Sequence, residues 1–141
     1  MDIPQIRDRI ADVIRQNLPE IEVSTDYAPV LSVEPDAVVC SIQPMSLTAA
    51  VLDRVRYTYE PRISITIASS LINNRNIVGD LILKTVDKML NLLLGMGFDG
   101  SVIKSIEITD PILNEQTIPN NNMAVARMIV NLYSHESRTK Q

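Results

Sequence analysis

The chain has 141 residues, a length that suits a single domain able to bury a hydrophobic core. Hydrophobic residues make up 45% of it, and Ile and Val are abundant among them, so we expect a large share of sheet. The net charge is −4, with acidic and basic residues mixed along the chain, which excludes the broad basic surface of a duplex-binding protein. We therefore predict one domain over residues 1–141 without specific nucleic-acid binding.

The apolar segments and the cysteine content indicate the environment of the protein. No segment reaches the ~20 apolar residues of a membrane span, and the start of the chain is too charged for a signal peptide. Cys40 is the sole cysteine and lies in the apolar run Ala37–Ile42, where we expect a small buried thiol. These features predict a protein of a reducing cytoplasm with no membrane partner.

The first predicted element is an amphipathic helix over Ile3–Leu18, where apolar residues recur at helical spacing. Asp2 is a suitable N-cap, and Pro4 lies in the first turn, where its missing N–H is harmless. Pro19 ends the helix because it restricts the residue before it. A short or irregular strand is predicted within Glu20–Ser32.

The next strand is predicted over Ala37–Gln43, which is nearly apolar on both faces. Pro44 is expected to close it, because proline cannot donate to a sheet ladder. The segment that follows, Met45–Asp53, is ambiguous between a helical turn and a strand. We interpret it as a loop or the tip of a hairpin.

The strongest pattern in the sequence is the alternation of a long strand over Val55–Ala68. Tyr57, Tyr59, Pro61, Ile63, Ile65 and Ile67 fall on one face, and polar or charged residues occupy the other. Pro61 requires an edge, a bulge or a bend. Extended, the segment would span roughly 46 Å at about 3.3 Å per residue, so part of it is expected to project from the body as a hairpin arm.

A second helix and two strands complete the predicted elements. The helix covers Asn76–Leu94 and carries a wide apolar stripe, with Gly95 or Gly97 at its C-terminal end. Strands are predicted over Ser101–Thr109 and Asn122–Ser134, and the second is apolar on both faces, as a central strand would be.

Polar segments separate and follow these two strands. Ile112–Asn121, with its Pro119 and three consecutive asparagines, is predicted as a loop. Residues 135–141 are predicted as a flexible C-terminal tail. The resulting fold class is α+β: two layers, with two main helices on one face of a mostly antiparallel sheet of four to five strands and a possible projecting hairpin.

Residues able to perform catalysis are few and dispersed. His135 is the only histidine and lies in the predicted tail. No histidine is therefore predicted near Cys40 to act as its general base. Metal-ligand spacing is absent, and the glycines of residues 95–100 follow a helix rather than precede one, unlike a phosphate-binding loop. Asp99, Asp110 and Glu115 are the only loop carboxylates that we retain as an alternative enzyme site. We predict no enzyme, no cofactor and no metal.

The charged face of the long strand is the candidate functional surface. Its candidate residues for a subunit interface are Arg54, Arg56, Glu60 and Arg62. A solvated or aggregation-protected sheet face would carry the same charges. A charged face that meets its complement on a neighbouring subunit is the functional alternative.

The order and size of these elements resemble the tail terminator (tail-completion) proteins of long-tailed bacteriophages. The resemblance rests on the opening helix, on the long strand that leads into the second helix, and on the closing strands: Ile3–Leu18, Arg56–Ala68, Leu71–Asn76, Ile77–Leu94, Val102–Thr109 and Met123–Tyr133. It implies a structural virion protein, assembled in the host cytoplasm. It also implies a hexameric ring that caps the tail tube and contacts head–tail connector proteins.

Two other functions remain open at this level. One is a small ferredoxin-like α+β module that dimerises and binds a metabolite or peptide in a pocket lined by Tyr57, Tyr59 and Phe98. The other is the enzyme with the three loop carboxylates. A homo-oligomer of about six subunits is the outcome that would separate the tail terminator from both.

Overall fold

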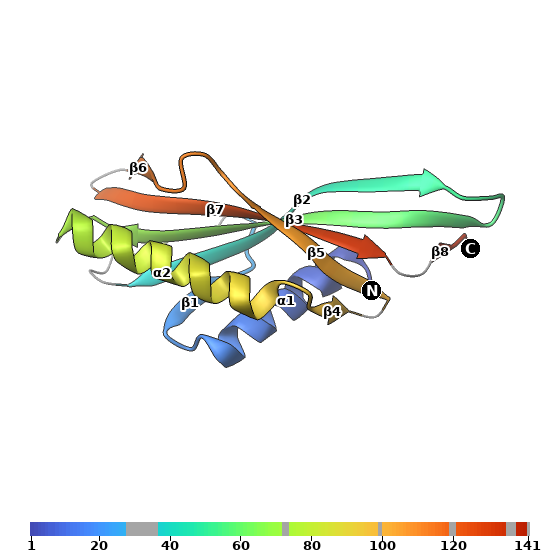
Figure 1. Ribbon diagram of the computed structural model, residues 1–141, viewed down its shortest axis with the longest axis horizontal. Helices are drawn as coiled ribbons and strands as arrows, with labels where there is room; N and C mark the ends of the chain where they lie inside the picture. Colours follow the sequence, from blue (N-terminus) through green and yellow to red (C-terminus); the bar gives the residue numbers. More distant parts are fainter. Residues whose placement is uncertain (28–36, 72–73, 99, 119–120, 135–137, 141) are drawn as a thin grey trace.

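A computed structural model describes residues 1–27, 37–71, 74–98, 100–118, 121–134 and 138–140, and in it two helices cover one side of a curled sheet (Figure 1). The main strand order is β1-β2-β3-β7-β5-β4, with β6 also on β7 and β8 also on β3. The first pair is parallel, and every other pair within the described residues is antiparallel. The strands are β1 (Ile21–Ser24), β2 (Val38–Val51), β3 (Arg56–Ser70), β4 (Gly97–Phe98), β5 (Ser101–Ile108), β6 (Asn114–Ile118), β7 (Asn121–Ser134) and β8 (Arg138–Thr139).

The predicted fold class is wrong in the size and shape of the sheet. Within the described residues the sheet has eight strands, is mixed and curls as a half-barrel. The additional strands come from segments without a hydrophobic period. β6 lies in the predicted loop Ile112–Asn121, and β4 and β8 have two residues each. These short strands are held by main-chain hydrogen bonds to a neighbouring strand. Such bonds do not require a side-chain pattern, so the sequence does not predict them.

The predicted C-terminal tail also differs from the structure. Arg138 and Thr139 form β8 against the start of β3, and the Lys140 N–H donates to the Val55 carbonyl. The rest of the predicted tail, at 135–137 and 141, lies outside the described residues. The tail pairs because the free edge of β3 lies within its reach.

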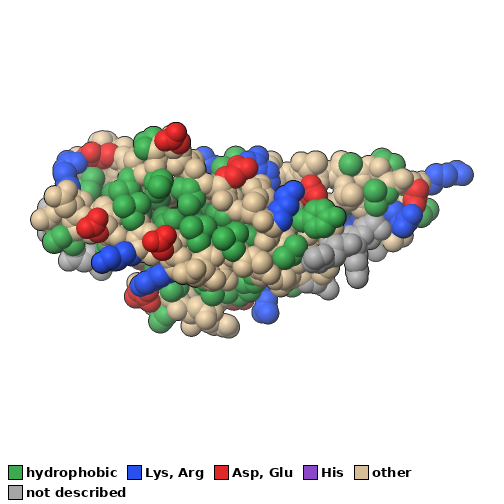
Figure 2. Space-filling model, viewed as in Figure 1, with side chains coloured by type: hydrophobic (Ala, Val, Ile, Leu, Met, Phe, Trp, Pro, Cys, Tyr) green, Lys and Arg blue, Asp and Glu red, His purple; other side chains and the backbone are tan. Residues whose placement is uncertain are grey.

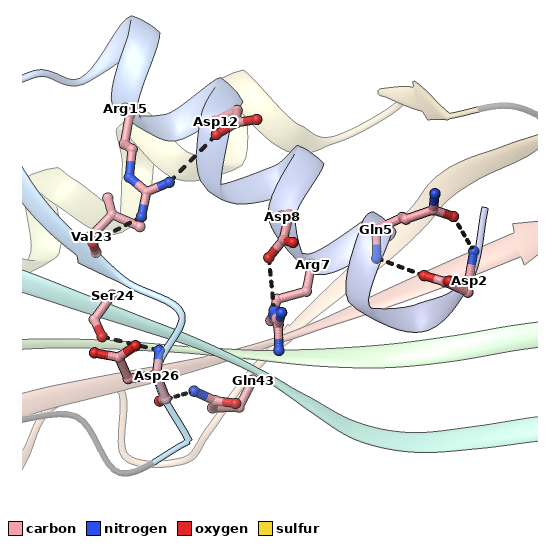
Figure 3. Close-up of polar contacts among 10 residues, drawn as sticks. All are labelled: Asp2, Gln5, Arg7, Asp8, Asp12, Arg15, Val23, Ser24, Asp26 and Gln43. Carbon is pink, nitrogen blue, oxygen red and sulfur yellow. Dashed lines mark hydrogen bonds and ion pairs between the residues drawn. The ribbon is translucent and has the colours of Figure 1, made fainter.

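Helix α1 (Ile3–Asn17) begins as predicted, with Asp2 as its N-cap. The Asp2 carboxylate accepts a hydrogen bond from the Gln5 N–H, and the Gln5 side chain accepts one from the Asp2 N–H, both at 2.9 Å (Figure 3). Near the other end, Arg15 donates to the Val23 carbonyl at 3.2 Å. This bond ties the helix to β1, which confirms a short strand after Pro19.

Helix α2 (Arg75–Leu93) also matches its prediction. The Asn74 side chain caps it by accepting hydrogen bonds from the N–H groups of Asn76 and Ile77. Gly95, just past the last turn, has φ of 78°, the left-handed conformation that glycine adopts without strain. The helix packs over β3 and β7, which places β7 in the centre of the sheet as predicted.

The predicted end of the second strand at Pro44 is wrong. β2 continues to Val51 because Met45 forms a β-bulge: Pro44 pairs with Ile63, and Ser46 pairs with Arg62. An extra residue on one strand absorbs the irregularity that proline introduces, and the ladder resumes beyond it. Met45–Asp53, predicted as a loop or hairpin tip, is therefore mostly strand, and the turn is confined to residues 52–55.

The predicted long strand is confirmed as β3, and its apolar face forms the centre of the core. Ile63, Ile65 and Ile67 are fully buried beneath the helices. The opposite face is less exposed to solvent than the alternation predicts, because Ala68 packs with Val39 and Met123 in a second, small hydrophobic cluster. The core therefore lies mainly between the helices and the strands β2, β3 and β7.

Candidate functional site: the hairpin arm

The feature that stands apart from the body is the outer half of the β2–β3 hairpin, residues 46–61, which we call the hairpin arm. It extends beyond both helices (Figure 1). Its strands pair from Ser46 with Arg62 to Val51 with Tyr57. The ladder between β3 and β7 ends at Arg62, next to Pro61, which has no N–H to donate. The arm leaves the body where this ladder stops.

One face of the arm carries exposed apolar side chains. The bulge at Met45 sets Leu47, Ala49 and Val51 opposite Pro61, Tyr59 and Tyr57, on the face that continues the core side of the sheet. Val51 is 72% exposed, and the turn adds two further apolar residues that are more than half exposed. We call this set the arm stripe: Leu47, Ala49, Val51, Leu52 and Val55. Contiguous exposed apolar side chains mark interaction surfaces.

The turn of the arm is held by Asp53. Its carboxylate accepts hydrogen bonds from the N–H groups of Val55 and Arg56 at 2.9 Å each, and from the Arg56 guanidinium at 2.6 Å. These bonds, the one from the Val55 N–H foremost, lower the pKa of Asp53. Arg54 is exposed between them, so the turn presents a cation beside the arm stripe.

The base of the arm is polar on the side that faces away from the helices. Arg62 donates to the Asn131 side chain at 3.0 Å and lies 3.4 Å from the Glu107 carboxylate. Asn131 in turn donates to the Ser105 hydroxyl at 3.2 Å. These contacts join β3, β7 and β5 in register, and Glu60 shares a cavity of about 180 Å³ with Arg62.

The C-terminal segment covers part of the arm. The Arg138 guanidinium lies 3.4 Å from the centroid of the Tyr59 ring, a cation–π contact, and Tyr59 is buried. Tyr57 meets the Tyr59 ring edge-on at 6.5 Å and lines an open cavity of about 720 Å³ with Arg138, Thr139 and Lys140. The Arg138 side chain therefore covers Tyr59 on the β3 half of the apolar face, and Leu47, Ala49 and Val51 on the β2 half stay exposed.

The four interface candidates lie on the arm and at its base, but not as one row. Arg54 and Arg56 belong to the turn, Arg56 in an ion pair with Asp53. Glu60 and Arg62 lie at the base, where Arg62 joins three strands. The sequence interpretation missed the arm stripe. Its signal was the alternation of Leu47, Ala49 and Val51, which the bulge puts out of phase with the strand before it.

The other residues considered for chemistry are dispersed. Cys40 is buried as predicted, and its burial raises the pKa of the thiol to about 12. Asp110 is exposed, and Glu115 forms an ion pair with Arg75 at 2.8 Å. Asp99 and His135 lie outside the described residues. Phe98, expected in an aromatic pocket with the two tyrosines, is buried in the core.

In the part of the chain that the structure describes, no group of three or more His, Cys, Asp or Glu residues could hold a metal ion. None of the helices in these same ranges is long and apolar enough to cross a membrane.

Comparisons with known proteins add information on the fold alone. No protein family and no curated protein matches the sequence. Among solved structures, 21 chains match. One, whose name describes no function, has a TM-score of 0.51 and 11% identity over 92% of this chain and 89% of its own. The architecture therefore has relatives among solved proteins, at an identity that indicates shared fold only.

Proposed function

We propose that this chain is a structural virion protein, a tail terminator or closely related neck component of a long-tailed bacteriophage. In this role it forms a hexameric ring that caps the tail tube and joins it to the head through connector proteins. It performs no catalysis and needs no cofactor.

The observation that supports a ring subunit is the hairpin arm with its exposed apolar face. Val51, Leu52 and Val55 are each more than half exposed and lie together at the end of the arm, where β8 adds only two residues beside the two strands of the hairpin. Two-stranded hairpins have little stability of their own, and exposed apolar patches favour association. A closed ring requires each subunit to offer two different surfaces, and a projecting arm is well suited to be one of them.

The test is the mass of the purified protein in solution at micromolar concentration. We expect an oligomer of about six subunits, and we expect the double variant Val51→Asp/Leu52→Asp to be monomeric, because assembly would bury two unpaired carboxylates. Ile77→Asp is the matched control: Ile77 is a solvent-exposed isoleucine in the first turn of α2, where an acid suits the helix. A wild-type protein that stays monomeric at every concentration and never caps tail tubes would contradict the proposal.

A second candidate function is a dimeric binding module for a metabolite or peptide. The cavity beside Tyr57 favours it, because Arg138 and Lys140 bring two cations to its wall. Such a module would have the mass of a dimer. Its ligand affinity would fall on Arg138→Ala while the arm variant kept its assembly.

A further inference from the structure

The body carries a second apolar surface, between α2 and β5, toward the end of the molecule away from the turn of the arm (Figures 1 and 2). Gly79 shows which flank of α2 faces β5: a Cβ built there would lie 3.4 Å from the Leu113 side chain, in the loop after β5. At about 100° per residue, Leu83, Leu90 and Leu94 lie on the same flank as Gly79. Leu83 and Leu94 are exposed, and Leu90 is partly so.

Strand β5 contributes the other side of this surface. α2 packs over β3 and β7, so β5 lies beyond the strip that the helix covers. Ile106 and Ile108 face the core but are only partly buried. We define the α2–β5 patch by six residues: Leu83, Leu90, Leu94, Ile106, Ile108 and Ile112. Figure 2 shows hydrophobic side chains gathered in this region, with acidic side chains beside them.

The border of the patch carries two acidic side chains, opposite in charge to the turn of the arm, while the exposed Lys84 and Lys88 lie about 100° and 140° further around the helix than Leu83. Asp80 and Asp87 are exposed on α2 and lie toward solvent from the apolar flank, about 60° and 40° further around the helix than Leu83. The turn of the arm presents the exposed Arg54, and its neighbour Arg56 already has Asp53 as partner. An apolar stripe with a cation at its end thus has a counterpart in an apolar patch with acids at its border.

We propose that the arm stripe of one copy docks on the α2–β5 patch of a neighbouring copy, with Arg54 beside Asp80 and Asp87. The inference rests on the proposed function and names the partner surface of the arm. Within one chain the arm points away from α2, so the two surfaces meet only between copies (Figure 1). Because they are different surfaces, the contact repeats from subunit to subunit and can close a ring.

The dimensions of the two surfaces agree. The six residues of β2 from Ser46 to Val51 span about 20 Å at ~3.4 Å each, and the stretch of α2 from Asp80 to Leu94, which carries the patch and its acidic border, spans about 22 Å at ~1.5 Å per residue. The arm fits along the helix with room for its turn to reach the acidic border.

A mixing experiment tests the pairing of the two surfaces. The arm variant is Val51→Asp/Leu52→Asp and the patch variant is Leu83→Asp/Ile112→Asp, so that the two altered surfaces repel each other; all four positions are at least one-third exposed, so both variants should fold. We expect each alone to be monomeric. Mixed at equal concentration, they should form a dimer and nothing larger, because the only intact pair is the patch of the arm variant with the arm of the patch variant. Ile77→Asp, on the opposite flank of α2, should assemble as the wild type does.

The outcomes separate this inference from the proposed function. If the wild type and the patch variant form the oligomer equally well, the docking contact is refuted but the proposed ring is not. A mixture that stays monomeric, or that forms complete rings, also overturns the docking. A wild type that is monomeric at all concentrations overturns both.

Cysteine cross-linking gives an independent readout of the contact. In Val51→Cys/Ile112→Cys an oxidant should link neighbouring copies, and a non-reducing gel should show a ladder up to the ring size. The native Cys40 is 1% exposed and does not compete. Val51→Cys/Arg9→Cys, with its second thiol on the exposed side of α1, is the control. An equal ladder in the control, or none in an oligomeric protein, would exclude the contact.

The salt link has its own test. Arg54→Glu should weaken association about tenfold, the effect expected of one charge pair at a partly exposed contact, and Asp87→Arg in the same chain should restore it. Restoration identifies the pair. A double variant that remains as weak as Arg54→Glu, or weaker, contradicts the placement of Arg54 beside Asp87.

Discussion

The body and the arm share the strands β2 and β3, yet side chains on the same face of the sheet are buried in the body and exposed in the arm. In the body that face carries Ile42 and Ile65, fully buried under the helices. In the arm it carries Val51, which is 72% exposed, although β2 and β3 stay paired along the whole hairpin. Periodicity therefore decides which side chains share a face, and the element lying over that face decides whether they are buried.

Truncating one side chain in each region tests this difference in burial most directly. Ile65→Ala should lower the free energy of unfolding by about 3 kcal/mol, because it leaves a cavity in a packed core. Val51→Ala should change it by no more than about 0.5 kcal/mol, because the side chain is solvated. Urea denaturation at low protein concentration measures both. A loss at Val51 as large as that at Ile65 would mean that the arm stripe is covered within one chain.

The buried thiol of Cys40 should make the stability of the body depend on pH. Burial raises the pKa of Cys40 from 9.0 to about 12, so the neutral thiol favours the folded state. Its contribution is complete below pH 9 and is lost as the pH rises from 9 toward 12, because the unfolded chain ionises first. At pH 10 the loss should be roughly 1 kcal/mol relative to Cys40→Ala. Parallel pH curves for the two proteins would contradict the burial of this thiol.

Helix capping in the body should have an effect of similar size. Asn74→Ala removes the acceptor for two N–H groups at the start of α2 and should lower the free energy of unfolding by about 1 kcal/mol. Asn74→Asp is the control and should restore most of it, since its carboxylate can accept both bonds. If thermal unfolding is unchanged in the alanine variant, α2 does not depend on its cap.

The smallest effect is expected at the turn of the arm. The pKa of Asp53 is lowered by its bonds to the Val55 N–H and to Arg56, so these bonds are present above the ordinary pKa of an aspartate and are lost as the pH falls through the lowered value. Acid should therefore speed amide exchange at Val55 and Arg56 relative to the intrinsic rate, without unfolding the body. Asp53→Asn should loosen these amides at neutral pH. Equal protection at both pH values would show that the turn holds without the carboxylate.

The elements with local signals were predictable. Asp2 and Asn74 cap helices because a short polar side chain before an apolar periodic run satisfies free N–H groups of the same segment. Gly95 ends α2 because the chain needs a left-handed residue there. The two faces of β3 follow from its alternation. Each of these signals lies within a few residues of the structure that it predicts.

The candidate site was only partly predictable. Arg54 and Arg56 lie on the arm, as their position in the long strand suggested, but the arm stripe required knowledge of the bulge at Met45. The α2–β5 patch could not be found from the sequence. Leu90 and Ile108 belong to segments predicted to face the core, and only the place of α2 over β3 and β7 leaves them partly uncovered.

Local signals in the sequence specify the separate elements: two capped helices, a long two-faced strand, and an apolar strand suited to the centre of a sheet. Hydrogen bonds and side-chain periods within one segment specify these. The tertiary structure alone decided that β2 passes through Pro44, that polar segments pair as β6 and β8, and that the hairpin outreaches its helices. Pairing and coverage depend on residues far apart in the chain, and no local pattern contains them.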